Sequence, residues 1–245
     1  QCSSKIWKTI KDRLSISDDI SKSIRNILIR ILKKHAKLFA MDRKDNGCIT
    51  NFEMSINTGD TTPISSVPYR YSPIQKKAIE LEIKHLLECN LIEKANSPWG
   101  FPVVLAVKQD GTYRFCVDYR KLNACTIKDS YPLPTIQDSL DMLGGSCYFS
   151  ALDMMSGYWQ IKVNRTYRGK TTFVSHMGAY AFKRMPFGLT NAPACFQRCM
   201  DSILSSVKNL FCMVYLDDVI IFTKSANEHL NQIDEVLTLL ENAGA

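Results

Sequence analysis

The most hydrophobic run of the chain reads Leu210-Phe-Cys-Met-Val-Tyr-Leu-Asp-Asp-Val-Ile-Ile-Phe222, and two adjacent acids interrupt it. Arms of this length and composition are typical of β-strands, so the sequence predicts a hairpin with Asp217 and Asp218 at its tip. Two neighbouring carboxylates repel each other and are costly to hold beside a core, and a divalent cation is the strongest candidate to offset them. An ordinary exposed turn is the competing interpretation at this point, because Asp is common in turns.

Length and composition are those of a globular protein. The 245 residues are 45% hydrophobic, which suits a buried core, and no apolar run reaches the roughly 20 residues that span a bilayer, so we expect no membrane partner. The chain begins at Gln1 without a signal peptide or an initiating Met, which suggests a piece of a longer precursor. Nine scattered Cys, no Cys-x-x-Cys pair and four His argue against a zinc site and favour a reducing, intracellular setting.

The net charge of +7 belongs to the N-terminal segment. Residues 1–52 carry 12 Lys/Arg and 5 Asp/Glu, whereas the rest of the chain carries 19 of each. A second basic region has no acid between Asp153 and Asp201 and interleaves cations with aromatic residues. This pattern is typical of a nucleic-acid track, where cations meet phosphates and rings stack on bases. A solvated basic face over a core gives the same pattern, and the pattern alone leaves both interpretations open.

Periodicity and composition divide the chain into three parts. We expect a basic helical N-terminal extension over residues 1–52, a linker over residues 53–70 and a mixed region over residues 71–245. The expected helices lie within residues 5–40, from Pro73 to Cys89, from Pro134 to Gly144, after Asn191 and after Ser225. The expected strands are Phe101–Lys108, Tyr113–Val117, Tyr148–Asp153, Thr171–Ser175 and Ala179–Arg184. Helices mixed with antiparallel hairpins indicate the α+β class.

A third acid, Asp153, ends the strand expected before the Asp217-Asp218 hairpin. If the two strands are neighbours in one sheet, three carboxylates converge. Such a cluster suits two hard divalent ions about 3.5–4 Å apart, the arrangement that catalyses phosphoryl transfer in polymerases. Mg²⁺ prefers oxygen ligands and substrate phosphates.

Several blocks of the sequence together resemble the reverse transcriptases of gypsy-class LTR retrotransposons. Tyr215-Leu-Asp-Asp218 is similar to their Tyr-x-Asp-Asp box, and Leu152-Asp-Met-Met-Ser-Gly-Tyr158 is similar to their first carboxylate motif. The further blocks are Pro68-Tyr-Arg-Tyr-Ser-Pro73, Ser97-Pro-Trp-Gly-Phe-Pro-Val-Val104, Tyr113-Arg-Phe-Cys-Val-Asp-Tyr-Arg-Lys-Leu-Asn123 and Met185-Pro-Phe-Gly-Leu-Thr-Asn-Ala-Pro-Ala-Cys-Phe-Gln197. A lone Tyr-x-Asp-Asp would be weak evidence for this family, but the ordered set of blocks spans residues 55–245 and is highly specific.

The resemblance implies the fingers and palm of a right-hand polymerase, with an antiparallel palm sheet backed by helices. It implies RNA-directed DNA polymerase activity with two Mg²⁺ ions, for which Mn²⁺ can substitute. The implied partners are a primed RNA or DNA template, deoxynucleoside triphosphates and the rest of a Pol polyprotein with protease, RNase H and integrase. Thumb, connection and RNase H parts do not appear in these residues, so we expect little processive synthesis from this chain alone. The implied location is the cytoplasm or a virus-like particle.

The resemblance also assigns roles to individual residues. The expected catalytic and metal-binding residues are Asp153, Asp217 and Asp218. The expected nucleotide-binding residues are Lys108, Arg114, Met154, Met155, Tyr158 and Phe187. Cations on a hairpin suit a polyanion such as a triphosphate, the two Met would contribute backbone, and the ring at Tyr158 would exclude a 2′-hydroxyl. Plain core packing is the alternative for the two aromatic residues.

Two other functions are weighed against this one. A catalytically inactive retroelement relic would keep the fold as a nucleic-acid-binding or interaction module, and the three intact acids argue against it. A nucleotide cyclase with a palm-type fold would need no primer. The blocks at Tyr113–Asn123 and Met185–Gln197 argue against the cyclase.

Overall fold

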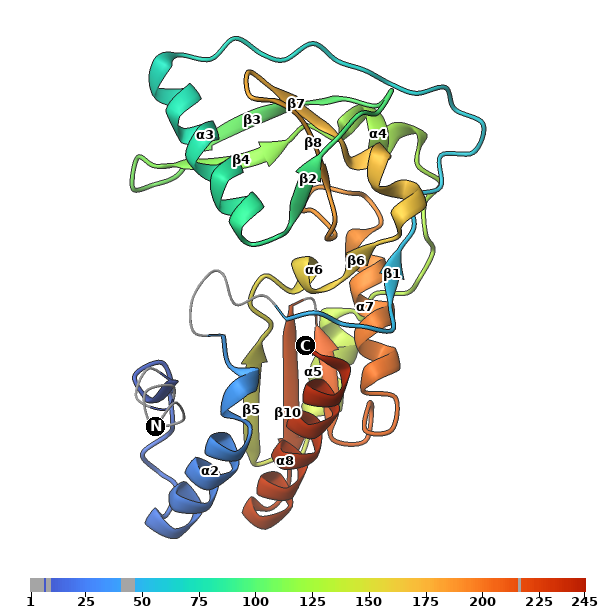
Figure 1. Ribbon diagram of the computed structural model, residues 1–245. Helices are drawn as coiled ribbons and strands as arrows, with labels where there is room; N and C mark the ends of the chain where they lie inside the picture. The colour runs from blue at the N-terminus through green and yellow to red at the C-terminus, as the bar shows by residue number, and fades with distance from the viewer. Residues whose placement is uncertain (1–6, 8–9, 41–46, 216) are drawn as a thin grey trace. The chain divides into compact units, whose positions relative to one another are not determined.

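The computed structural model describes residues 7, 10–40, 47–215 and 217–245 (Figure 1). The helices are α2 (Lys22–Lys34), α3 (Pro73–Glu88), α4 (Arg120–Cys125), α5 (Ile136–Leu143), α6 (Gly157–Gln160), α7 (Ala192–Ile203) and α8 (Ala226–Ala243), with 3-10 helices η1 (Ala36–Leu38) and η2 (Arg165–Thr171). The strands are β1 (Glu53–Met54), β2 (Ile92–Lys94), β3 (Phe101–Val107), β4 (Tyr113–Val117), β5 (Tyr148–Asp153), β6 (Lys162–Val163), β7 (Phe173–Ser175), β8 (Gly178–Phe182), β9 (Cys212–Tyr215) and β10 (Asp218–Thr223). This order confirms the α+β class. Residues 5, 6, 8 and 9 of the expected N-terminal helix and Leu216 of the hairpin lie outside the described residues.

The chain forms two compact units. The first comprises residues 1–50, 131–157 and 196–245, and the second comprises residues 51–130 and 158–195. No helix in the described ranges is long and apolar enough to cross a membrane.

The first unit is built on a three-stranded antiparallel sheet in the order β5-β10-β9. The central strand β10 buries Val219 and Ile221 completely, so the apolar run after the two acids becomes the middle of the sheet. Helix α8 packs against β10 and β5 (Figure 1). The buried face of this helix includes Leu230, Ile233, Leu237 and Leu240.

A buried histidine links α8 to two strands of this sheet. The Nε2 of His229 lies 2.9 Å from the hydroxyl of Ser150 in β5, and its Nδ1 lies 3.1 Å from the hydroxyl of Thr223 in β10. Desolvation by burial lowers the pKa of His229, which favours the neutral ring. A neutral imidazole donates from one nitrogen and accepts at the other, and hydroxyl groups can match both roles. The contacts therefore fix α8 against β5 and β10 without a buried charge.

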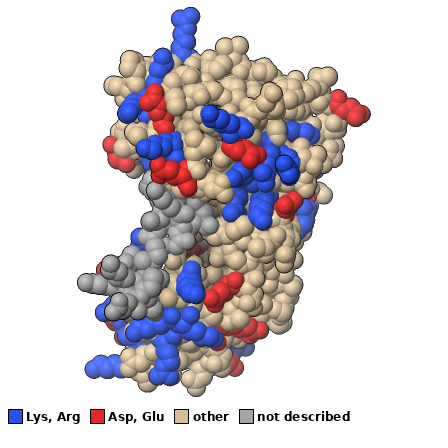
Figure 2. Space-filling model, viewed as in Figure 1, with Lys and Arg blue, Asp and Glu red and all other residues tan. Residues whose placement is uncertain are grey.

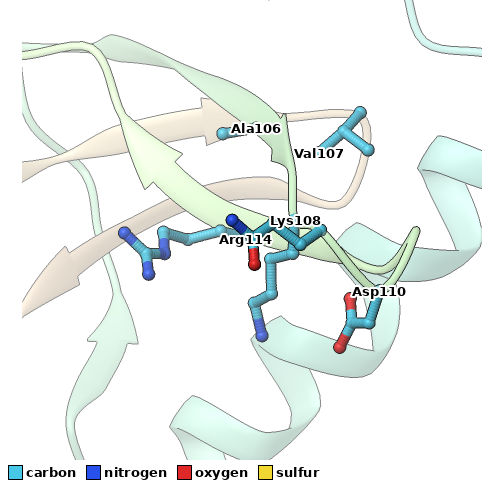
Figure 3. A pocket seen from close by; sticks show the side chains of 6 residues that line it. Ala106, Val107, Lys108, Asp110 and Arg114 are labelled. Carbon is cyan, nitrogen blue, oxygen red and sulfur yellow. The ribbon is translucent and has the colours of Figure 1, made fainter.

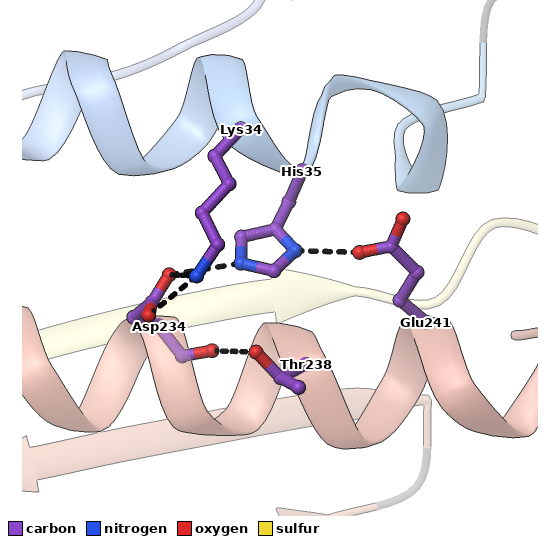
Figure 4. A network of polar contacts seen from close by, with 5 residues as sticks. All are labelled: Lys34, His35, Asp234, Thr238 and Glu241. Carbon is purple, nitrogen blue, oxygen red and sulfur yellow. Dashed lines mark hydrogen bonds and ion pairs between the residues drawn. The ribbon is translucent and has the colours of Figure 1, made fainter.

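A second histidine attaches α2 to α8 (Figure 4). His35 is 2% exposed, and its Nδ1 lies 2.7 Å from Glu241 Oε2 while its Nε2 lies 2.9 Å from Asp234 Oδ1. The Nζ of Lys34 donates to both oxygens of Asp234 at 2.8 Å. Both ring nitrogens of His35 and the ammonium of Lys34 therefore face carboxylates of α8. The N-terminal helix is thereby packed on the first unit.

The second unit contains a five-stranded sheet in the order β2-β8-β7-β3-β4, in which only β3 and β7 pair in parallel. Helix α3 contributes Ile79, Ile83 and Leu86 to the core of this unit, together with Phe173 of β7. A reciprocal capping box between Ser72 and Gln75, with Pro73 at the first position, starts the helix where the sequence predicted.

Part of the expected linker is packed into this unit. Strand β1 pairs with β6, and Ile56 and Thr58 are 1% and 3% exposed. The Nζ of Lys170 donates to the carbonyl of Ile56 and the hydroxyl of Thr58, both at 2.9 Å. This part of the expected linker is therefore extended but held in place by the second unit.

Several elements differ from the sequence-based expectations. Helices α4 and α6 and the 3-10 helix η2 were not predicted, since each is too short for a periodic pattern. Helix α5 begins at Ile136 rather than Pro134, because the hydroxyl of Thr135 accepts from the N–H of Asp138 at 3.1 Å and makes Thr135 the cap.

Replacing His35 tests the attachment of α2. His35→Ala leaves Asp234 and Glu241 without the ring donors, so we expect the free energy of unfolding to fall by about 1–3 kcal/mol in urea denaturation at neutral pH. Lys22→Ala, on the exposed side of α2, should change it by less than about 0.5 kcal/mol. Equal stability of the two variants would contradict the role of His35.

The same contacts predict a dependence on pH. The hydrogen bond from Lys34 and then that from His35 lower the pKa of Asp234 from its usual 3.8, against partial desolvation. The folded protein then binds fewer protons than the unfolded chain, so this stabilisation is present above about pH 4 and is lost as pH falls through the lowered pKa. Urea titrations of Asp234→Asn should lack that acid-dependent loss.

Candidate active site

The two acids of the apolar run lie at a hairpin tip, as predicted. Strands β9 and β10 pair with Asp218 opposite Tyr215, so residues 216 and 217 form a two-residue connection. Asp217 and Asp218 are both exposed. The buried arms of the hairpin hold the tip in place, and the acids face solvent at the end of the sheet.

The third acid comes from the neighbouring strand. In the β5–β10 ladder Asp153 is the direct partner of Asp218, and directly opposed side chains lie on the same face, with Cβ atoms about 4.5–5.5 Å apart. The carbonyl of Asp217 accepts from the N–H of Met154 at 2.9 Å. The structure therefore brings Asp153, Asp217 and Asp218 together from two strands and one turn, as the sequence predicted.

The acids of the cluster repel one another. Desolvation raises the pKa of Asp217, and the charges of Asp153 and Asp218 raise it further. Among the described residues no three Asp, Glu, His or Cys side chains already stand in metal-binding geometry. The backbone thus gathers the carboxylates, while their side chains are not yet directed at one point. All the available ligand atoms are oxygens, which fits a hard divalent cation.

The turn after Asp153 is tight. Met154 is 8% exposed and Met155 is half-buried, and Ser156 adopts a left-handed conformation with φ of 50°. A Cβ on Gly157 would lie 2.8 Å from the ring of Phe196, so this position requires glycine. The backbone of the two Met is therefore held beside the strand end, as the nucleotide-binding prediction needs.

The two predicted pocket aromatics lie in the second unit and contact each other. The ring centroids of Tyr158 and Phe187 are 5.2 Å apart, and Trp159 lies edge-on to Phe187 at 5.7 Å. Phe187 is 50% exposed. Plain core packing does not describe a half-exposed phenylalanine, so its free face is available to a ligand.

Asn123 holds the loop that carries Phe187, a role that its sequence block did not indicate. Its side-chain amide donates to the carbonyl of Gly188 at 2.8 Å and accepts from the N–H of Thr190 at 2.9 Å. Gly188 has a φ of 91°, which favours glycine. The sequence offered only a Phe-Gly turn and an Asn far away in the chain as signals of this role. These residues come into contact only in the folded protein.

The two predicted triphosphate ligands lie on the β3–β4 hairpin of the second unit (Figure 3). Arg114 is the cross-strand partner of Ala106, and the N–H of Lys108 donates to the carbonyl of Thr112 at 2.8 Å. Because side chains alternate along a strand, Lys108 falls on the same face as Ala106 and Arg114. Both cations line an open hollow of about 580 Å³, together with Ala106, Val107, Gln109 and Asp110.

The basic region between Asp153 and Asp201 is largely occupied by internal contacts. Five of its cations bond within the units: Arg168 to Glu93, Lys170 to Ile56 and Thr58, Lys183 to Asn90, Arg184 to the carbonyl of Gln160, and Arg198 over the ring of Tyr131. These cations stabilise the fold, and the pattern alone did not distinguish this role from a nucleic-acid track.

The family described as "Reverse transcriptase (RNA-dependent DNA polymerase)" matches residues 106–245. The chain belongs to the reverse transcriptase family. Among curated relatives, the Pol polyprotein of the Drosophila melanogaster transposon 297 is 42% identical over 193 residues, which are 77% of this chain and 18% of the relative. The Pol polyprotein of the transposon gypsy is 34% identical over 248 residues, 99% of this chain and 24% of the relative. These matches confirm the gypsy-class resemblance, and the chain spans about a fifth of the relatives' length.

Solved structures confirm the fold. The prototype foamy virus protease-reverse transcriptase superposes with a TM-score of 0.83 at 24% identity, over 99% of this chain and 31% of that one. A foamy viral protease-reverse transcriptase in complex with an RNA/DNA hybrid gives 0.82 at 23% identity, over 99% and 31% of the two chains. The mixed sheet-and-helix units are thus those of reverse transcriptase fingers and palm.

Replacing Asp217 tests the charge of the cluster. Asp217→Asn removes one of three repelling carboxylates, so in metal-free buffer we expect the free energy of unfolding to rise by about 0.2–1 kcal/mol. Millimolar Mn²⁺ should raise the melting temperature of the natural protein and have a much smaller effect on Asp217→Asn. Asp60→Asn, an exposed acid of the second unit, is the control and should keep the Mn²⁺ response. A metal response that survives in Asp217→Asn would exclude Asp217 as a ligand.

Proposed function

We propose that this chain is the RNA-directed DNA polymerase domain of a gypsy-class LTR retrotransposon. It would add deoxynucleotides to a primer 3′-end by nucleotidyl transfer. The observation that carries the proposal is the cross-strand pairing of Asp153 with Asp218, with Asp217 in the adjoining turn, in a chain of the reverse transcriptase family. The first unit then corresponds to the palm and the second to the fingers. Residues 1–52 would be an N-terminal extension, of which helix α2 packs on α8 of the palm, and residues 53–70 would connect it to the fingers.

Asp153, Asp217 and Asp218 are the residues that would hold divalent metal ions, which reverse transcriptases generally use. Two bound Mg²⁺ ions, or Mn²⁺ in their place, would lower the pKa of the attacking hydroxyl and neutralise charge on the triphosphate. The protein's own contribution is to fix three oxygen donors at one strand end. The apolar hairpin arms do this, because their buried side chains anchor both strands in the core and leave the acids at the exposed tip.

The remaining residues would bind the nucleotide. Lys108 and Arg114 present two cations on one face of a hairpin, which suits a triphosphate. Tyr158 and Phe187 offer contacting rings to the sugar and base, and Asn123 fixes the loop of Phe187. The backbone after Asp153, at Met154 and Met155, would lie near the phosphates.

The proposed partners follow the relatives. One neighbour in fold is described in complex with an RNA/DNA hybrid and another with double-stranded DNA, and we propose that this chain binds a primed RNA or DNA template. The curated relatives are Pol polyproteins, so we propose protease, RNase H and integrase as its polyprotein context. A cytoplasmic or virus-like-particle location belongs to the same proposal.

Primer extension tests the activity. The natural chain should incorporate dTTP on oligo(dT)-primed poly(rA) with Mg²⁺ or Mn²⁺, Asp60→Asn should do the same, and Asp217→Asn should lose at least about 10²-fold in rate. If the chain extends poorly alone, the assay is repeated with downstream sequence of a relative fused after residue 245. Binding of the primed duplex without metal-dependent incorporation in both forms would favour the inactive relic, and product formed without primer would favour a cyclase.

The hairpin cations are tested by steady-state kinetics. Lys108→Ala and Arg114→Ala each remove a charge-assisted contact to the triphosphate, so the KM for dTTP should rise by about tenfold or more. The apparent affinity for primed template should stay the same. Lys77→Ala, an exposed cation on α3, should leave the KM for dTTP unchanged. A drop in kcat with unchanged KM would place these residues outside the triphosphate site.

A further inference from the structure

Helix α2 has one face turned to the protein and one face made of cations. At about 100° per residue, Lys22, Arg30 and Lys33 fall within an arc of about 80°, and Asn26 lies between them. The helix Lys22–Lys34 contains no acid. Most of its apolar residues, Ile24, Leu28, Ile31 and Leu32, lie toward the opposite side, where Leu32 is 5% exposed, whereas Ile29 lies beside the cations and Ile27 is 40% exposed. We call Lys22, Arg30 and Lys33 the α2 basic stripe, and Lys37 in η1 continues it.

The stripe is exposed and is not neutralised within the part of the chain that the structure describes. Lys22, Arg30, Lys33 and Lys37 are all exposed, and none of them forms an ion pair there, although Lys33 lies 5.1 Å over the ring of Trp7. The other cations of the helix are paired, Arg25 with Asp18 at 3.1 Å and Lys34 with Asp234 at 2.8 Å. Figure 2 shows Lys and Arg side chains gathered over the α2 region.

The stripe is fixed to the unit that carries the carboxylate cluster. His35 and Lys34 join α2 to α8 through Asp234 and Glu241, and α8 packs on the sheet that ends in Asp153 and Asp218. A polyanion held on the stripe would therefore be held by the same rigid unit as the cluster.

The geometry favours a nucleic-acid backbone over a membrane. An interfacial helix inserts its apolar face into lipid, but the apolar face of α2 is turned inward, where Leu32 is buried and His35 contacts α8. A straight row of cations about 16 Å long matches the regular phosphates of a duplex, which carries one charge per about 1.7 Å.

We propose that the α2 basic stripe binds the phosphodiester backbone of nucleic acid outside the metal cluster. This proposal deepens the polymerase function and rests on it. The contacts are to phosphates alone, so the stripe is independent of sequence and raises the affinity for primed template rather than the rate of the chemical step.

The salt dependence of binding is the expected measurable effect. Removing three phosphate contacts should lower the slope of log K against log salt by about 2–3 for a duplex and by about 2 for a single strand. The test is fluorescence anisotropy of a labelled RNA/DNA hybrid, and separately of single-stranded RNA, between about 50 and 200 mM KCl. The variant is Lys22→Gln/Arg30→Gln/Lys33→Gln in the full chain, with circular dichroism to verify folding.

The matched control removes the same charge elsewhere. Lys76→Gln/Lys77→Gln/Lys84→Gln changes three exposed cations of α3, a helix that also carries acids, and it should change the slope by less than about 1. Lys22→Arg/Lys33→Arg keeps the stripe charged and should bind as the natural chain does. The hybrid and single-stranded arms identify which form of nucleic acid the stripe holds.

Three results would overturn the proposal. The stripe variant could keep the salt slope of the natural chain, or the α3 control could lose as much of that slope as the stripe variant. The stripe variant could also bind nucleic acid as before and lose binding only to vesicles containing phosphatidylserine. Primer extension by the natural chain is measured in parallel. If the natural chain extends the primer in a metal-dependent way but the stripe variant keeps its salt slope, only the proposal for the α2 basic stripe is refuted. If binding depends on the stripe but the primer is not extended, the polymerase function is refuted and a nucleic-acid-binding module remains.

Discussion

The pairing of β5 with β10 is the constraint on which the candidate site depends. Asp153 stands directly opposite Asp218, and Asp217 follows in the turn. A slip of one residue would turn every side chain of a strand to the other face, so the acids meet only in this register. The register is set by the apolar residues after the acids, since Val219 and Ile221 are completely buried. Core packing thus holds together three like charges that would otherwise separate.

Polar contacts attach the helices to this sheet and complete the unit. His229 links α8 to Ser150 and Thr223 on two strands, where burial lowers its pKa and favours a neutral ring. His35 differs because both of its nitrogens lie within hydrogen-bond distance of carboxylates, and together with Lys34 it attaches α2 to α8. The Lys34–Asp234 ion pair is largely exposed and adds little net stability by itself, so these contacts chiefly fix where α2 lies.

The sequence predicted the features that short-range chemistry determines. The hairpin at Asp217-Asp218, the start of α3 at Pro73 and the two strands on either side of Asp110-Gly111 all depend on a few adjacent residues, and all three are present. The convergence of Asp153 with the hairpin was predicted on the condition that the two strands are neighbours in one sheet, and the pairing of β5 with β10 fulfils that condition. Long-range polar contacts were not predictable: Asn123 holds Gly188 and Thr190, and Lys170 holds Ile56 and Thr58, across separations that carry no periodic signal. For the same reason the basic region after Asp153 looked like a binding track, although most of its cations serve the fold.

We propose that β5, β10 and the adjoining turn build a metal site from carboxylates that repel one another when no cation is bound. The most direct test is anomalous diffraction at the manganese edge from crystals grown with Mn²⁺, primed template and an incoming nucleotide. We expect anomalous peaks at the carboxylates of Asp153, Asp217 and Asp218. Manganese bound elsewhere, with none at this strand end, would contradict it.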